Sequence, residues 1–134
     1  MKKTIENSHR KSAPLVAVVD DDNSMREALE SLLKSVGFRT AIFASANEFL
    51  NADENTKPDC LILDVRMPEV NGLELQRKLV SENRRLPIVF ISAHCEADEK
   101  EQALSAGAID FLYKPFSDES LLCAVERAIK TKTS

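Results

Sequence analysis

The sequence predicts an α/β domain in which one doubly wound, five-stranded parallel sheet is covered by helices on both faces. Five short apolar runs recur along the chain with little polar alternation, which is typical of strands buried on both sides. Segments of helical periodicity separate these runs, and repeated βα units favour right-handed crossovers. The expected strands cover residues 15–19, 41–43, 60–63, 88–91 and 109–112.

The first helix is predicted from apolar spacing and from the residues at its two ends. Apolar residues within 25–36 follow the i, i+3, i+4, i+7 spacing of an amphipathic helix, and Gly37 is a suitable stop. Ser24 and Glu27 have the spacing of a capping box at its start. Asp22 is expected to face solvent near this helix start.

Four more helices follow the later strands. Ser45 and Glu48 have capping-box spacing at the second helix, and Asn71-Gly72 begins the third. The fourth, residues 97–106, offers mainly Ala103 and Leu104 to a core, so we expect it to be loosely held. The last helix is indicated by Leu121, Leu122, Val125, Ala128 and Ile129.

Composition is that of an ordinary soluble domain. The chain has 134 residues, of which 43% are hydrophobic and 30% charged, and this length suits one domain with a real core. A net charge of -4 argues against direct binding of nucleic acid by this domain. No apolar stretch is long enough to cross a membrane, and the basic start lacks the apolar segment of a signal peptide, so we expect a cytoplasmic protein.

Domain boundaries and cysteines add smaller expectations. We expect a flexible tail over residues 1–13, the folded domain over 14–130, and a tail or the start of a linker over 131–134. The three cysteines show no metal-site spacing, and we interpret Cys60 and Cys123 as small buried hydrophobic residues.

Polar side chains follow four of the five strands. Asp20 and Asp21 come after the first strand, Asp64 after the third, Ser92 after the fourth and Lys114 after the fifth. Ligands of open parallel sheets bind outside the carboxyl ends of the strands. We therefore expect three acids, a hydroxyl and an amine to meet at one edge of the sheet.

These residue types suit phosphoryl chemistry. Several carboxylates at one point need a cation, and oxygen-rich sites of this kind suit Mg²⁺, with Mn²⁺ as a substitute. A carboxylate can attack phosphorus and become an aspartyl phosphate. An ammonium, a hydroxyl and the metal would then bind the phosphoryl oxygens.

The same residues lie within four motifs, "VVDDD", "LILDVRMPEVNGLEL", "IVFISAH" and "GAIDFLYKPF". In this respect the chain resembles receiver domains of two-component response regulators from about residue 15 to residue 130. It is most similar to receivers of nitrogen-fixation and nitrate-response transcription factors. The resemblance implies a flavodoxin-like fold with the sheet order 2-1-3-4-5.

The resemblance also implies roles for the residues that coordinate metal and phosphate. Asp64 would be the phosphoacceptor. Asp21 would bind Mg²⁺ directly and Asp20 through water, while Arg66 would offer its backbone carbonyl to the metal. Lys114 would bind phosphate, and its peptide bond to Pro115 would be cis.

A switch is implied as well. Ser92 matches the switch hydroxyl. Phe111 matches the switch aromatic residue, which we expect to rotate inward on phosphorylation, although its local pattern favours a core position and the two roles are compatible. The fourth helix, fifth strand and fifth helix would form the face that changes. The implied partners are a sensor histidine kinase, a second copy of the domain after phosphorylation and, if the chain is a fragment, a DNA-binding output domain that controls transcription.

The domain would then be no enzyme in the ordinary sense, because it assists phosphoryl transfer to, and hydrolysis from, its own Asp64. Two other classes remain open at this point. An aspartate-nucleophile phosphatase would have a second acid two residues after the nucleophile, where this chain has Arg66. A flavin- or nucleotide-binding module of the same fold would have hydroxyl or glycine residues after the first strand, where this chain has acids.

Overall fold

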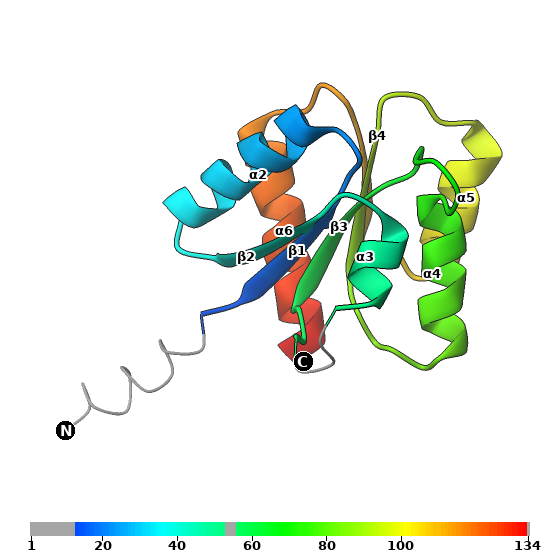
Figure 1. Ribbon diagram of the computed structural model, residues 1–134, viewed down its shortest axis with the longest axis horizontal. Coiled ribbons are helices and arrows are strands. Elements are labelled where there is room, and N and C mark those ends of the chain that lie inside the picture. The colour runs from blue at the N-terminus through cyan, green and yellow to red at the C-terminus, as the bar shows by residue number, and fades with distance from the viewer. Residues whose placement is uncertain (1–12, 53–55, 134) are drawn as a thin grey trace.

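A five-stranded parallel sheet with the order β2-β1-β3-β4-β5 runs through the described part of the chain (Figure 1). The computed structural model describes residues 13–52 and 56–133. The strands are β1 (Leu15–Val19), β2 (Arg39–Phe43), β3 (Cys60–Asp64), β4 (Ile88–Ser92) and β5 (Asp110–Tyr113). Each predicted strand is found with ends shifted by at most two residues, and the predicted sheet order is confirmed.

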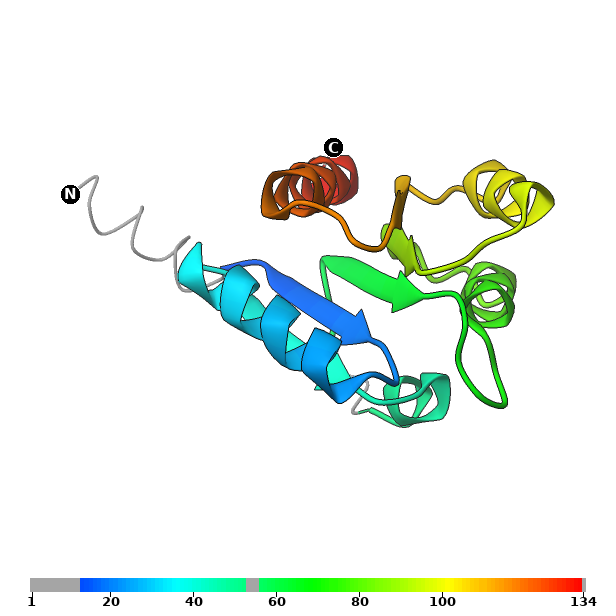
Figure 2. The same ribbon diagram turned by 90° about the horizontal axis from the view of Figure 1, so that it is seen from above.

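Helices cover both faces of this sheet. They are α2 (Asn23–Ser35), α3 (Ala46–Leu50), α4 (Gly72–Ser81), α5 (Ala97–Ser105) and α6 (Asp118–Thr133). Figure 2 shows α6 on one side of the strands and α3 and α4 on the other. Within the described residues, no helix is both long and apolar enough to span a membrane.

The two cores follow from the alternation of side chains along each strand. Val16 and Val18 pack with α2 and α6, whereas Ala17 and Val19 pack with the helices of the other face. Successive residues of a strand point to opposite faces, so an unbroken apolar run supplies both cores at once. The central strands β1, β3 and β4 are buried throughout, as their sequences predict.

The start of α2 differs from the prediction. Asp22, not Ser24, caps the helix, and its side chain accepts hydrogen bonds from the backbone N–H groups of Ser24 and Met25. The capping box that we assigned to Ser24 and Glu27 is therefore wrong, because a carboxylate two residues earlier already binds the free amides. Asp22 is exposed, as expected, but it has this structural role.

The later helices agree with the sequence more closely. Asn71 caps α4 in a complete capping box with Glu74, so the predicted start at Asn71-Gly72 is confirmed. Ser45 caps α3 through the backbone N–H of Glu48, while the Glu48 side chain accepts from the N–H of Ala44. The second half of that predicted box is thus displaced by one residue.

Helix α5 is weakly anchored, as predicted. Ala103 is its one buried residue, and Leu104, which we expected in the core, is 41% exposed. Cys60 is buried as expected, but Cys123 lies on the exposed side of α6, so that prediction is wrong. Helix α6 continues to Thr133, three residues past the predicted domain end, while residues 1–12 of the expected tail lie outside the described residues.

Candidate functional site

Three carboxylates meet at the carboxyl edge of the sheet. Asp20 directly follows β1 and Asp64 ends the neighbouring strand β3, whose residue Leu63 pairs in register with Val19. This register brings the next residue of each strand to the same level. Carboxylate oxygens of Asp20, Asp21 and Asp64 all lie within 4.8 Å of one another, so the predicted acidic cluster is formed.

Lys114 reaches this cluster from the loop after β5. Its Nζ atom lies 3.0 Å from Oδ2 of Asp20 and 3.7 Å from Oδ1 of Asp64. The backbone N–H of Lys114 donates to the carbonyl of Ser92, which aligns the loop with the end of β4. The peptide bond to Pro115 is cis, as the family resemblance implies.

Both the side chain and the backbone of Asp20 are fixed by hydrogen bonds. Its side chain is fully buried, and Oδ1 accepts a hydrogen bond of 2.9 Å from the backbone N–H of Asp22. The guanidinium of Arg26 donates to the Asp20 carbonyl over 2.7 Å. Sequence reasoning missed Arg26, for which the available signal was its position one helical turn after the acidic run.

The electrostatics of the cluster disfavour ionisation of Asp64 when no cation is bound. Burial and the neighbouring negative charge of Asp20 raise the pKa of Asp64 to about 7, against the opposing effect of Lys114. Burial lowers the pKa of Lys114, but its hydrogen bond to Asp20 and the charge of Asp64 outweigh that effect and raise it overall. Lys114 is therefore a charged amine among acids that it only partly neutralises.

Ser92 is at the predicted edge, but its hydroxyl points elsewhere. The side chain is buried, and Oγ donates to the carbonyl of His94 over 2.6 Å. Among the described residues, the structure shows no hydrogen bond between Ser92 and Asp64. A hydroxyl held by the following loop is one that must turn before it can bind a group on Asp64.

Phe111 already lies inward. It is 4% exposed, and its ring stacks on Phe90 with the centroids 5.7 Å apart. The core position that its local pattern favours is confirmed, and the inward position that we expected on phosphorylation is already occupied in this structure. The neighbouring Tyr113, 44% exposed, is the aromatic residue of β5 that reaches the surface.

Arg66 connects the site to α5 through its side chain. Its Nη2 atom lies 2.6 Å from Oε1 of Glu99, on the first turn of α5. The role that we expect for its backbone carbonyl, as a metal ligand, stays a prediction. The side-chain contact adds a direct link between the loop after Asp64 and the weakly anchored helix.

Gly72 has a packing role that sequence reasoning missed. The sequence predicts only that Asn71-Gly72 begins a helix, yet a Cβ atom at this position would lie 2.4 Å from the carbonyl oxygen of Asp64. The Gly72 N–H also donates to the carbonyl of Val65. A glycine is needed here because α4 begins directly against the backbone of the candidate phosphoacceptor.

The donor set fits a divalent cation. Asp20, Asp21 and Asp64 offer carboxylate oxygens from two neighbouring strand ends, and Asp21 is exposed to solvent while the other two are buried. Hard oxygen ligands with room for water are what Mg²⁺ prefers. The acidic cluster is thus compatible with metal binding.

Fold and site together define a class: a doubly wound α/β domain whose carboxyl edge presents an acidic cluster, a lysine and a hydroxyl. A family model described as "Response regulator receiver domain" matches residues 16–126. The chain belongs to this family of receiver domains. This confirms the resemblance found in the four sequence motifs and disfavours the phosphatase and flavin alternatives.

Several relatives are transcriptional regulators by name. Response regulator protein TmoT of Ectopseudomonas mendocina is 49% identical over 116 residues, which cover 87% of this chain and 53% of that protein. Transcriptional regulatory protein FixJ of Bradyrhizobium diazoefficiens is 37% identical and shares 86% of this chain and 56% of its own length. The chain spans about half the length of these curated relatives.

Solved structures agree with the sequence comparison. The response regulator StyR superposes with a TM-score of 0.84 at 44% identity, covering 90% of this chain and 61% of that one. The crystal structure of FixJ-N gives 0.80 at 34% identity, with 87% and 94% covered. The similarity to FixJ also bears out the nitrogen-fixation type of receiver that the sequence suggested.

Proposed function

We propose that Asp64 accepts a phosphoryl group from a sensor histidine kinase, and that this modification switches the domain in two-component signalling in the cytoplasm. The observation that carries the proposal is the meeting of Asp20, Asp21, Asp64 and Lys114 at one edge of the sheet. Lys114 comes from the far edge strand β5, and its Nζ atom is nevertheless within 3.7 Å of the Asp64 carboxylate. Membership of the receiver family supports the assignment.

The transfer is a simple displacement at phosphorus. A carboxylate oxygen of Asp64 forms a bond to phosphorus as the bond between phosphorus and the donor atom breaks, and the electron pair of that bond leaves with the donor. In the later hydrolysis, water attacks phosphorus, the bond between phosphorus and Asp64 breaks, and inorganic phosphate is released, which restores the carboxylate. Both reactions act on Asp64 itself, so the domain has no separate substrate to turn over.

The surrounding residues prepare Asp64 for this reaction. Asp20, Asp21 and Asp64, with the backbone carbonyl of Arg66, would hold Mg²⁺, and Mn²⁺ would serve in its place. A bound divalent cation supplies positive charge that keeps Asp64 ionised and offsets charge on the phosphoryl oxygens. Lys114 would bind those oxygens by charge, and the Ser92 hydroxyl would bind them by hydrogen bonding after it turns away from the His94 carbonyl.

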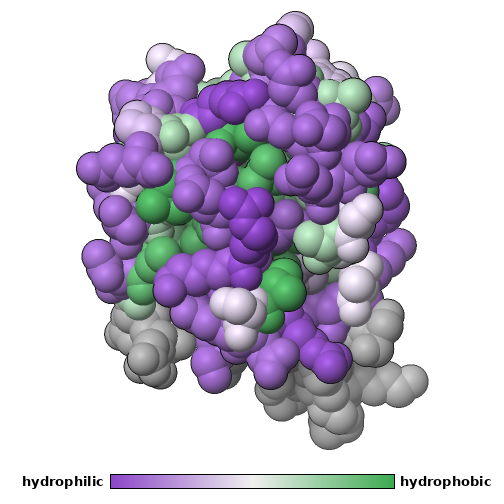
Figure 3. Space-filling model, turned by 90° about the vertical axis from the view of Figure 1, so that its right-hand side faces the viewer, coloured by the Kyte–Doolittle hydropathy of each residue, from purple (hydrophilic) through white to green (hydrophobic). Residues whose placement is uncertain are grey.

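The surface that would change on phosphorylation is formed by α5, β5 and α6. Figure 3 shows the side of the molecule that carries α4 and α5, where hydrophilic side chains dominate and hydrophobic ones lie between them. Exposed Leu104 on α5 and Tyr113 on β5 belong to the face that we expect to change. A second phosphorylated copy would bind there, and a DNA-binding output domain, as in relatives named transcriptional regulators, would convert the change into control of transcription.

Mass spectrometry after incubation with acetyl phosphate and Mg²⁺ tests the proposal. One phosphoryl group should be added to the wild-type chain and none to Asp64→Asn, while Asp59→Asn, which changes a carboxylate at the opposite end of β3, should still be modified. Equal labelling of wild type and Asp64→Asn would overturn the assignment of Asp64.

A further inference from the structure

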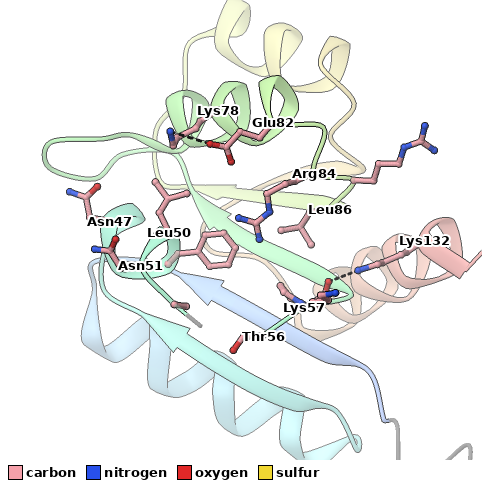
Figure 4. Close-up of a pocket in the computed structure, with 14 residues that line it drawn as sticks. Asn47, Leu50, Asn51, Thr56, Lys57, Lys78, Glu82, Arg84, Leu86 and Lys132 are labelled. Atoms are coloured by element: carbon pink, nitrogen blue, oxygen red, sulfur yellow. Dashed lines mark hydrogen bonds and ion pairs between the residues drawn. The ribbon is translucent and has the colours of Figure 1, made fainter. Parts of the chain in front are cut away.

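A cavity of about 720 Å³ lies at the end of the sheet opposite to the acidic cluster. Its walls are α3, residues 56–58 before β3, the end of α4, residues 84–86 before β4, and Lys132 on α6 (Figure 4). Asp64 is at the carboxyl end of β3, whereas the cavity adjoins the amino ends of β3 and β4. The two sites are therefore separated by the length of a strand.

The lining of this cavity is strongly basic. Its described residues include one carboxylate, Glu82, and five cationic side chains: Lys57, Lys78, Arg84, Arg85 and Lys132. The chain as a whole has a net charge of -4, so this concentration of positive charge is local. Cations from four separate segments of the chain around one hollow produce a field that favours a multiply charged anion.

Two of the five cations have polar partners in the protein. Lys78 pairs with Glu82 over 3.2 Å, and Lys132 donates to the carbonyl of Pro58 over 2.7 Å and lies 4.0 Å from Oδ1 of Asp59. Within residues 13–52 and 56–133, the structure shows no carboxylate partner for Lys57, Arg84 or Arg85. These cations have hydrogen-bond donors available for a ligand.

Arg84 is the central residue of the cavity. Its guanidinium carbon lies 5.6 Å from the centroid of the buried Phe49 ring, a cation–π contact that positions this exposed side chain beside α3. Figure 4 shows Arg84 directed toward Leu50 and α3. A guanidinium positioned by a ring face keeps its planar N–H groups free for bidentate contact with a phosphate.

The rest of the lining suits an organic group. Phe49, Leu50 and Leu86 provide apolar surface, and Asn47 and Asn51 add amide groups that both donate and accept hydrogen bonds. The volume falls within the range of about 300–1,000 Å³ that is typical of small-molecule sites. Charge alone would suit any anion, but this combination suits an anion with a planar or apolar part.

We propose that this cavity, here called the basic cavity, binds an organic polyphosphate, in which several phosphates are joined to a planar group. The phosphates contact Arg84 and Lys57, and the organic part lies against Leu50 and Leu86. This site is independent of Asp64 and does not require the domain to be phosphorylated. Inorganic polyphosphate shares the charge but lacks the organic part, so the two ligands can be separated by experiment.

Calorimetric titration of the intact chain with ATP, in EDTA so that no metal bridges nucleotide and acidic cluster, tests the proposal. ATP should bind more tightly than tripolyphosphate or adenosine. Arg84→Ala should weaken ATP binding at least about tenfold, since hydrogen bonds to charged groups are strong. Lys57→Ala, on an exposed residue of the loop, should weaken it too.

Arg77→Ala is the matched control, because it removes a positive charge from another face of α4 and should leave ATP binding unchanged. Thermal unfolding will show whether each variant is folded, and Lys57→Ala still tests the site if Arg84→Ala is not. Amide chemical shifts should change at residues 47–52 and 84–86. Absent binding, tripolyphosphate binding as tightly as ATP, equal losses in Arg77→Ala, or shifts confined to the acidic cluster would each overturn the proposal.

Discussion

The ammonium nitrogen of Lys114 lies 3.0 Å from Oδ2 of Asp20, although 94 positions separate the two residues. The same nitrogen is 3.7 Å from Asp64, so one positive charge serves two buried carboxylates. Charge compensation is therefore incomplete within the protein, because one ammonium lies among three carboxylates and is closer to Asp20 than to Asp64. A further positive charge would therefore stabilise the acidic cluster.

The first prediction is that the contribution of Asp64 to the stability of the metal-free protein falls as pH rises from about 4 toward 7. The folded pKa of Asp64, about 7, is above its ordinary value of 3.8, so the folded state holds a proton that the unfolded state releases within this window. Rising pH therefore favours unfolding until Asp64 is ionised. Urea denaturation in EDTA at a series of pH values measures this.

Asp64→Asn is the control for that experiment, because it removes the titrating group and retains its shape. The wild-type free energy of unfolding should fall relative to the variant between these pH values and run parallel to it above pH 8. Parallel curves throughout the range would contradict the raised pKa.

The second prediction separates the two exposed acids of the run, Asp21 and Asp22. Asp21→Ala should weaken Mg²⁺ binding strongly, because its carboxylate belongs to the acidic cluster. Asp22→Ala should leave Mg²⁺ affinity almost unchanged but lower the free energy of unfolding by about 1 kcal/mol, since it removes the cap of α2. Metal titration and urea denaturation of both variants test this division, and equal losses of affinity would refute it.

Much of the fold was predictable because the signals are local. Buried strands need unbroken apolar runs, and the residue after each run of a parallel sheet lies at the same edge. The end of each apolar run therefore predicted that four polar residues meet there: Asp20, Asp64, Ser92 and Lys114. Family motifs then supplied the sheet order. The main elements of the acidic cluster were thus accessible without coordinates.

What the sequence could not predict depends on local backbone and packing geometry. Asp22 and Ser24 can both cap a helix, and only the backbone conformation at Asp22, extended with φ -87° and ψ 113°, decides between them. The exposure of Leu104 depends on how α5 is rotated against its neighbours. The direction of the Ser92 hydroxyl depends on the backbone of the following loop, which no spacing rule describes.

The third prediction concerns Gly72. The sequence alone did not indicate that a side chain at this position would collide with the backbone of Asp64. Gly72→Ala should lower both the stability of the domain and the rate of phosphorylation by acetyl phosphate, because the added methyl group would lie 2.4 Å from the Asp64 carbonyl. Gly37→Ala is the comparison. At that position the backbone has φ +99° and open space, so stability should fall by about 1 kcal/mol while phosphorylation proceeds unchanged. Equal phosphorylation rates in the two variants would contradict the proposed close approach.

The fourth prediction concerns how Ser92 transmits the effect of phosphorylation from Asp64 to α5. In this structure the hydroxyl donates to the carbonyl of His94, two residues before the N-cap of α5. A phosphoryl group on Asp64 adds about 1.5 to 2 negative charges and new acceptor oxygens. If Ser92 turns toward them, the loop before α5 loses that hydrogen bond.

Helix α5 can respond because its remaining anchors are few. Its buried contacts are Ala103 and the bond from the Gln76 side chain to the Ala103 carbonyl, and the Arg66–Glu99 ion pair adds a link to the loop after Asp64. The phosphoryl group can shift the helix only by binding one arrangement better than the other, and the Ser92 hydroxyl supplies that difference.

Ser92→Ala should therefore still accept the phosphoryl group on Asp64 but show less phosphorylation-dependent self-association. Sedimentation of phosphorylated and unmodified wild type should show a larger mass for the phosphorylated form, and hydrogen exchange over residues 97–112 should change with it. Ser105→Ala, an exposed serine at the end of α5, is the control and should behave as wild type. If both wild-type forms have the same mass and the same exchange over 97–112, the switch through Ser92 and α5 is wrong. If Ser92→Ala associates as strongly as wild type, the signal leaves Asp64 by another contact, with the Arg66–Glu99 pair as the one that directly joins the next loop to α5.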